Sequence, residues 1–214
     1  MFLKTVALAS LFALLSGAAP IPDDSTITGP GILVSNKGTE STEYCFFNNL
    51  SNGDGYAVPN FDNPDTCVTI DAGACKFVPL SLSFKGRVQR GKTIPSTWVE
   101  FQTAASNDGQ AHGDISIEQG CDGAAVIRSN DGSGRQGGFT IDIVSEAPGS
   151  ATMIRQSDGK RVLASTMGNW LAPANNDAIQ WASSKIDASK TYIVGGTGVE
   201  DVASANNVFE VDFY

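Results

Sequence analysis

The sequence predicts a mainly β protein, a sandwich or barrel with a small helix-bearing lobe, and three observations lead to this prediction. Many short segments alternate apolar with polar residues, which is the pattern of half-buried strands. Clusters of Gly, Asn, Asp and Ser separate these segments and mark turns. Only one segment, residues 175–188, carries a convincing helical pattern. Short strands between turns, with so little helix, are typical of two packed sheets or a closed one.

Two segments in the middle of the chain, 98–102 and 114–118, alternate very regularly. Each is predicted to be a strand with one apolar and one polar face. If the two strands are antiparallel neighbours joined by the polar link 103–113, their apolar residues lie on one shared face. These residues are Val99, Phe101, Ile115 and Ile117.

The opposite face of this predicted pair collects acidic residues. Glu100, Asp114 and Glu118 would gather there, with facing Cβ atoms about 5 Å apart. Arg87, on the preceding predicted strand 84–88, is the candidate basic residue of the same surface. The simplest interpretation is a solvated sheet face, and the alternatives are a binding cleft or a catalytic pair.

The remaining elements follow the same logic. The glycine-rich tract 129–138 is the candidate boundary of a helical elaboration around 129–190, within a single domain, 19–214. In the helix, Asn175 or Asn176 is suited to cap the first turn. Further strands are predicted at 31–34, 43–47, 67–70, 75–80, 124–128, 139–144, 192–194 and 208–214, with a hairpin turn at 156–160.

The first 18 residues have the three-part layout of a secretory signal peptide: Lys4, an apolar run over 5–15, and small residues before the cleavage site. The apolar run is too short to span a membrane. We therefore expect a secreted, extracellular and monomeric mature chain. The formal net charge of −9, from 14 basic and 23 acidic residues, argues against nucleic acid or an anionic membrane as partner.

Four cysteines, Cys45, Cys67, Cys75 and Cys121, fit two disulfides in an oxidising compartment. Three connectivities are possible, and we favour Cys45–Cys67 with Cys75–Cys121, because each would join separated strands. Their spacing does not match a zinc site, and the chain has one histidine, so no metal or cofactor is expected. Asn49 begins an Asn-Leu-Ser sequence and is a candidate glycosylation site.

Several motifs resemble those of known secreted proteins. The order Gly86-Arg87-Val88, Trp98 to Phe101 and Asp114-Ile115-Ser116 resembles thaumatin-like proteins, across about residues 30–127. A wider pattern is similar to the hypersensitive-response-inducing elicitors secreted by plant-associated fungi. It includes the segments 85–91, 167–170, 192–198 and 211–214.

The elicitor resemblance implies an apoplastic, non-enzymatic protein with a thaumatin-like fold, perceived through a plant extracellular receptor or defence protein. The thaumatin resemblance implies an acidic cleft between lobes, to which Glu100 and Asp114 correspond. Gln119 stands where that family has a further Asp, which weakens both glycan binding and hydrolysis as inferences.

Two alternatives to an elicitor are therefore kept open. A β-1,3-glucan-binding module would use the acidic cleft, with Trp170 and Trp181 stacking on sugars if they are exposed. A weak β-1,3-glucanase would use Glu100 as general acid and Asp114 as base or nucleophile. That reaction needs one carboxyl with a raised pKa beside an ionised one, and Trp98 is the candidate apolar neighbour of Glu100.

Overall fold

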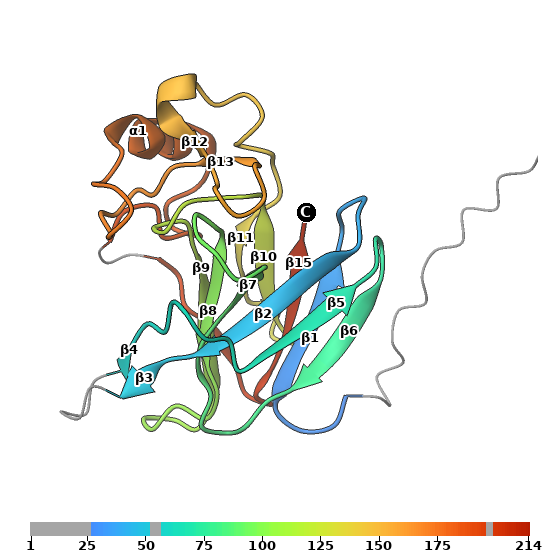
Figure 1. Ribbon diagram of the computed structural model, residues 1–214. Helices are drawn as coiled ribbons and strands as arrows, with labels where there is room; N and C mark the ends of the chain where they lie inside the picture. The colour runs from blue at the N-terminus through green and yellow to red at the C-terminus, as the bar shows by residue number, and fades with distance from the viewer. Residues whose placement is uncertain (1–26, 52–56, 196–198) are drawn as a thin grey trace, which may run out of the picture.

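A computed structural model describes residues 27–51, 57–195 and 199–214, and the expected signal peptide lies outside these residues. Two β sheets pack face to face, and a small lobe carrying the helix lies at one end of them (Figure 1). The mainly β prediction is confirmed. In the five-stranded sheet the order is β11 (Gln136–Phe139), β10 (Ala125–Ser129), β15 (Val208–Phe213), β1 (Gly31–Asn36) and β6 (Cys75–Pro79). In the six-stranded sheet it is β14 (Val202–Ser204), β9 (Ala111–Ser116), β8 (Trp98–Gln102), β7 (Lys85–Arg90), β2 (Thr42–Asn48) and β5 (Thr66–Ile70).

The small lobe holds the hairpin β12 (Thr152–Ile154) and β13 (Arg161–Leu163), the short 3₁₀ helix η2 (Gly149–Ala151) and α1 (Asn176–Lys185). Asn175 caps α1, its Oδ1 accepting a hydrogen bond from the backbone N–H of Ala178 at 2.9 Å. Within the described residues, no helix is long and apolar enough to cross a membrane.

Three sequence-based expectations for the secondary structure are wrong. The strand expected at 139–144 is wrong in its bounds: β11 begins at Gln136, inside the glycine-rich tract, and ends at Phe139. Only Tyr192 of the segment 192–194 pairs, through an isolated bridge to Ser116. The segment between the predicted strands 43–47 and 67–70, where no strand is expected, contains a small two-stranded sheet, β3 (Leu50–Ser51) and β4 (Ala57–Val58).

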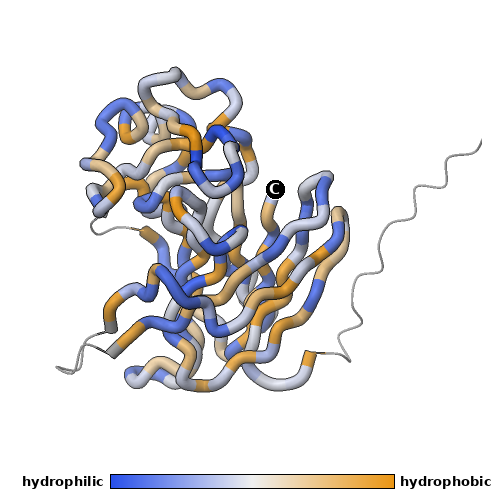
Figure 2. Tube along the Cα trace, viewed as in Figure 1, coloured by the Kyte–Doolittle hydropathy of each residue, from blue (hydrophilic) through white to orange (hydrophobic). Residues whose placement is uncertain are grey.

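The core lies between the two sheets and is built from the alternation that the sequence shows. Figure 2 shows hydrophobic and hydrophilic residues alternating along the strands. Apolar side chains of both sheets meet in one cluster, and its largest fully buried members include Tyr44, Phe46, Ile115, Ile127, Phe209 and Phe213. This rigid core leaves the outer face of the six-stranded sheet to carry polar chemistry.

Gly86 allows β2 and β7 to approach closely. A Cβ atom at this position would lie 1.9 Å from the carbonyl oxygen of Phe47, closer than any side chain tolerates. The glycine therefore has a packing role next to Arg87, in the middle of the sheet.

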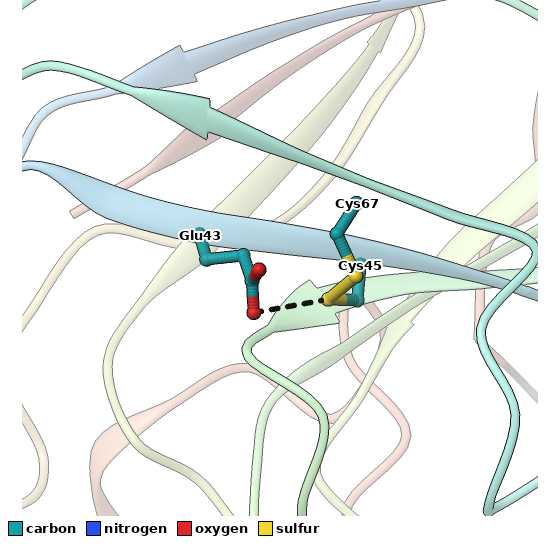
Figure 3. Close-up of side chains that lie close together, drawn as sticks. All are labelled: Glu43, Cys45 and Cys67. Carbon is teal, nitrogen blue, oxygen red and sulfur yellow. Dashed lines mark hydrogen bonds between the residues drawn. A yellow bond between two sulfur atoms is a disulfide. The ribbon is translucent and has the colours of Figure 1, made fainter.

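One disulfide, Cys45–Cys67, joins directly opposed residues of β2 and β5, as predicted (Figure 3). The carboxylate oxygen Oε2 of Glu43 lies 3.5 Å from the Cys45 sulfur. These three residues are the one group of potential metal ligands found among the described residues. Because the two sulfurs are bonded to each other, the group offers no thiolate to a metal and no S–H to the carboxylate.

The second predicted disulfide, Cys75–Cys121, is wrong. Both cysteines are free, Cys75 half-buried at the start of β6 and Cys121 fully buried. Cys121 is instead part of the core, where its backbone bridges to Leu163 and its sulfur accepts a hydrogen bond from the Thr97 hydroxyl at 3.3 Å. Burial raises the pKa of the Cys121 thiol to about 11, which keeps it protonated and unreactive.

Two arginines fasten the small lobe to the sandwich through Asp122. Arg155, after β12, donates from Nη1 to Asp122 at 2.8 Å and to the Pro95 carbonyl at 2.9 Å. Its Nε and Nη2 form a two-point contact with Asp158 in the hairpin turn. Arg90 of β7 reaches the other Asp122 oxygen at 3.1 Å. Because all three nitrogens of the buried Arg155 guanidinium donate hydrogen bonds, its charge is satisfied within the fold.

We expect chemical labelling to find two reactive thiols in the unfolded, unreduced protein, and four after reduction. This follows from one disulfide and two free cysteines. Paired replacement of Cys45 and Cys67 by Ser should lower the free energy of unfolding by about 3 kcal/mol. Cys75→Ser serves as the control and should change it by less than about 0.5 kcal/mol. Finding no thiol before reduction would contradict the assignment of Cys75 and Cys121 as free.

Candidate functional site

The candidate site is the outer face of the six-stranded sheet, where one row of side chains crosses four strands. Cross-strand partners in this row are Phe47 with Arg87, Arg87 with Glu100, and Glu100 with Asp114. The predicted pairing of β8 with β9 is therefore confirmed, with Glu100 opposite Asp114 and the apolar residues on the core side. The row runs from an aromatic half to an acidic half.

Arg87 occupies the aromatic half and is buried, with 1% of its surface exposed. Its guanidinium carbon lies 4.1 Å from the centre of the Phe47 ring and 4.0 Å from that of Trp98. Two flanking aromatic faces stabilise a cation that has little access to water. Burial lowers the pKa of Arg87 to about 10, opposed by Glu100, so the side chain stays charged at neutral pH.

The hydrogen bonds of Arg87 hold a covering segment onto the sheet. Nε donates to Gln89 at 2.8 Å, and Nη1 donates to the Asn60 carbonyl at 2.6 Å. The third nitrogen, Nη2, finds no hydrogen-bond partner among the described residues. Phe61, next to Asn60, packs on Trp98 with ring centres 5.3 Å apart. Arg87 therefore lies beneath the surface, and it is not an exposed member of an acidic cleft.

Glu100 and Asp114 form the acidic half and are mostly shielded from water rather than solvated. Burial and the nearby charge of Glu118 raise the pKa of Glu100 to about 7, although Arg87 and a hydrogen bond from Ser116 act against this rise. Burial and the charges of Glu100, Asp201 and Glu118 raise the pKa of Asp114 to about 8. The interpretation of these acids as an ordinary solvated face therefore does not hold.

Glu118 lies in the turn after β9, beside the other two acids. Burial raises the pKa of its carboxyl. Its backbone carbonyl accepts hydrogen bonds from the N–H groups of Thr166 and Met167, at 3.1 and 3.0 Å. Glu118 therefore links the acidic half to the loop that leaves β13.

A hollow of about 290 Å³ opens over Glu100 and Asp114. Its wall includes the exposed Lys85 and Asp201, and Asn49, the candidate glycosylation site, lies on the same wall. One oxygen of Asp114, Oδ1, is buried and has no hydrogen-bond partner among the described residues. The other polar groups of the lining, among them Lys85 and Gln102, offer hydrogen bonds to a small polar ligand.

His112 closes one side of the hollow in a three-residue cluster. Its Nδ1 lies 2.5 Å from Asp201, and its Nε2 lies 3.0 Å from Asp108. Burial alone would lower the pKa of His112, but hydrogen bonds to Asp201 and Asp108 outweigh it and raise the pKa. The cluster ties β9 to the chain entering β14, and no serine nucleophile is part of it.

Sequence reasoning brought together Glu100, Asp114 and Glu118, but it missed Asp201 and Tyr192. Asp201 lies 87 positions beyond Asp114 in the sequence. It reaches the site because β14 pairs with β9 at the edge of the sheet. Burial and the four acids, Glu100, Asp114, Glu118 and Asp201, raise the pKa of the Tyr192 hydroxyl. No local pattern pointed to either residue, since both arrive through tertiary pairing.

The two tryptophans named from the sequence differ in their surroundings. Trp181, on α1, is partly buried, donates a hydrogen bond to the Ile143 carbonyl at 2.7 Å and carries Lys185 over its ring. Trp170 is 61% exposed. Only Trp170 is therefore accessible for stacking on a ligand.

No protein-family model matches the sequence, and no curated protein matches it. Among solved structures, the chain is similar to the crystal structure of the protein elicitor MoHrip2 from Magnaporthe oryzae. The TM-score is 0.38 and the sequence identity 17%, over 52% of this chain and 78% of that chain.

We expect Glu100→Gln and Asp114→Asn to stabilise the protein at about pH 8 and to have little effect near pH 4. Both carboxyls have folded-state pKa values above their unfolded values near 4, so the folded state holds extra protons between those limits. Their contribution to stability is therefore largest below about pH 4 and is lost as the pH rises through about 7–8. The gain at high pH should be on the order of 1–3 kcal/mol, measured by urea unfolding across the pH range. Glu146→Gln, at an exposed position, is the control, and parallel pH profiles for all four proteins would contradict the argument.

We expect Arg87→Ala to lower the free energy of unfolding by about 3 kcal/mol, because it leaves a cavity between Phe47 and Trp98 and frees the covering segment. Arg87→Met, which keeps a long side chain, should lower the free energy of unfolding by less than Arg87→Ala does. Lys85→Ala, on the same strand but exposed, is the matched control and should change stability by less than about 0.5 kcal/mol. Denaturant unfolding measures all three, and equal losses for Arg87→Ala and Lys85→Ala would contradict the structural role of Arg87.

Proposed function

We propose that this chain is a secreted fungal protein that acts as an elicitor, recognised by a plant extracellular receptor or defence protein, with no enzymatic activity of its own. The non-enzymatic part is supported by the two carboxyls that face each other in the hollow, Glu100 and Asp114, because the pKa values of both are raised. The pKa values of Glu100 and Asp114 are raised to about 7 and about 8, and that of Glu118 is raised too. In a weakly acidic medium both members of the central pair are neutral.

Hydrolysis by paired carboxyls needs a different arrangement of charge. One carboxyl must be protonated to donate to the leaving oxygen, while its partner must be ionised to attack or to activate water. Glu100 and Asp114 face each other on neighbouring strands, and the pKa values of both carboxyls are raised. The glucanase alternative therefore lacks the ionised partner below neutral pH.

The proposal of an elicitor rests on the sequence resemblance to secreted fungal elicitors. Only some of the motifs that carry this resemblance are exposed, and only those could be recognised by a partner. The segment 85–91 is largely buried within and beside β7, and 211–213 lies in β15. Met167 and Trp170 are exposed on a single loop. A stable sandwich that displays a short exposed loop fits a protein that is recognised rather than one that transforms a substrate.

A β-1,3-glucan-binding module remains the second candidate, favoured by an open hollow lined by the polar side chains of Glu100, Gln102 and Asp114. Protonated carboxyls both donate and accept hydrogen bonds, as sugar hydroxyls require. Retention on insoluble β-1,3-glucan tests this candidate, and no retention of the wild-type protein would remove it.

We expect purified protein infiltrated into leaves at about micromolar concentration to trigger a defence response, and Glu100→Gln to trigger the same response as wild type. Reducing-sugar release from β-1,3-glucan should be at background for both proteins. Reduced and alkylated protein is the control for the need of an intact fold. Absence of a response to wild type would overturn the elicitor proposal, and sugar release that is lost in Glu100→Gln would establish an enzyme instead.

A further inference from the structure

A groove of about 690 Å³ lies where the small lobe meets the sandwich, apart from the acidic hollow. Trp170 and Leu171, which are 61% and 51% exposed, form one side. Phe61 and Pro95 contribute apolar surface from the sandwich. A volume in this range is typical of sites that hold small molecules or short chains.

The exposed indole of Trp170 is the end of a continuous stack. Its ring meets Phe61 nearly at right angles, with centres 4.4 Å apart. Phe61 packs on Trp98 at 5.3 Å, and Trp98 lies on the buried Arg87 guanidinium at 4.0 Å. The ring is therefore supported from beneath by fixed side chains while most of its surface faces solvent.

Asn169 fixes the backbone of the loop that carries Trp170. Its side-chain oxygen accepts from the N–H of Leu171 at 2.9 Å, and its amide nitrogen donates to Gln119 at 2.8 Å. Gln119, which departs from the thaumatin-like pattern, thus anchors this loop. A ligand meeting Trp170 would meet a surface that is already ordered, which lowers the entropic cost of binding.

The polar lining of the groove is balanced in charge and rich in hydrogen-bonding groups. Thr93 and Ser157 bond to each other across it at 2.6 Å, and Gln156 is exposed beside them. Lys92 and Asp62 contribute one charge of each sign. Arg155 adds no free charge, since Asp122 and Asp158 neutralise it. The lining therefore matches an uncharged ligand that carries many hydroxyl groups.

We propose that this groove binds a neutral oligosaccharide, with the Trp170 ring packed on the C–H face of a sugar and the hydroxyl and amide groups contacting its hydroxyls. A sugar ring pairs one apolar face with a polar edge, as the groove pairs an indole with Thr93, Ser157 and Gln156. The inference deepens the glucan-binding candidate and moves the contact from the acidic hollow to Trp170. It is independent of the elicitor proposal.

Titration calorimetry and ligand-observed NMR with three neutral probes test it: laminarihexaose, cellohexaose and chitohexaose. We expect saturable binding of at least one probe, and Trp170→Ala should weaken it by about tenfold or more. Trp170→Phe should retain part of the affinity. Since Trp170 is exposed, the variants should fold, and near-ultraviolet circular dichroism checks this.

The controls separate the groove from the hollow and from a general surface effect. Leu82→Ala removes an equally exposed apolar side chain, 59% exposed and outside the groove, and should bind like wild type. Glu100→Gln should also bind like wild type. Failure of all three probes to bind, unchanged affinity in Trp170→Ala, or loss of affinity in Glu100→Gln alone would each overturn the proposal. The leaf assay reports on the elicitor proposal separately, and a Trp170-dependent response without sugar binding would indicate a protein partner at this groove.

Discussion

The outer face of the six-stranded sheet depends on one buried cation, the Arg87 guanidinium, held between two aromatic rings. Arg87 is taken out of water between Phe47 and Trp98 and is bonded to a backbone carbonyl rather than to a carboxylate. Such a charge is tolerated only where π faces and hydrogen bonds replace water. The same contacts fold the segment at Asn60 over the sheet and provide the floor on which Phe61 rests. Without this cation, the covering segment would lack its main polar anchor.

The acids beside Arg87 follow from the same burial. Glu100 is the cross-strand neighbour of Arg87, yet burial and the nearby carboxylates outweigh the attraction and raise its pKa. Protonated carboxyls need no counter-ion, so the acidic half can be shielded without a paired base. The pKa of His112 is raised by two aspartates, so its contribution to stability is full below its unfolded value near 6.5 and is lost as the pH rises through its higher folded-state value. Both contributions favour the folded state at acidic pH.

Two distinct surfaces result on one sheet face. The acidic hollow lies over β8 and β9, whereas the Trp170 groove lies beyond the aromatic half, where the small lobe meets the sandwich. They differ in chemistry: the hollow is lined by titratable groups, and the groove by a supported ring and neutral polar groups. The tie of Arg155 and Arg90 to Asp122 fixes the lobe that forms one wall of the groove. Recognition of this protein by a partner, whether glycan or receptor, would therefore act on a rigid surface rather than on a mobile loop.

The local part of this arrangement follows from the amino-acid sequence alone. Alternation with a period of two placed the apolar residues of β8 and β9 on one face and Glu100 with Asp114 on the other, because a shift of one residue would turn every side chain over. The exact register, with Glu100 opposite Asp114, comes from the strand pairing itself. The sequence also limited the helix cap to Asn175 or Asn176, of which Asn175 is the cap, and favoured the Cys45–Cys67 bridge. The shielding of the acids, the internal position of Arg87 and the exposure of Trp170 could not be predicted in this way, because they depend on which distant segments cover the sheet in the folded chain. Period and composition describe a strand's two faces, and they carry no information about what packs on the second one.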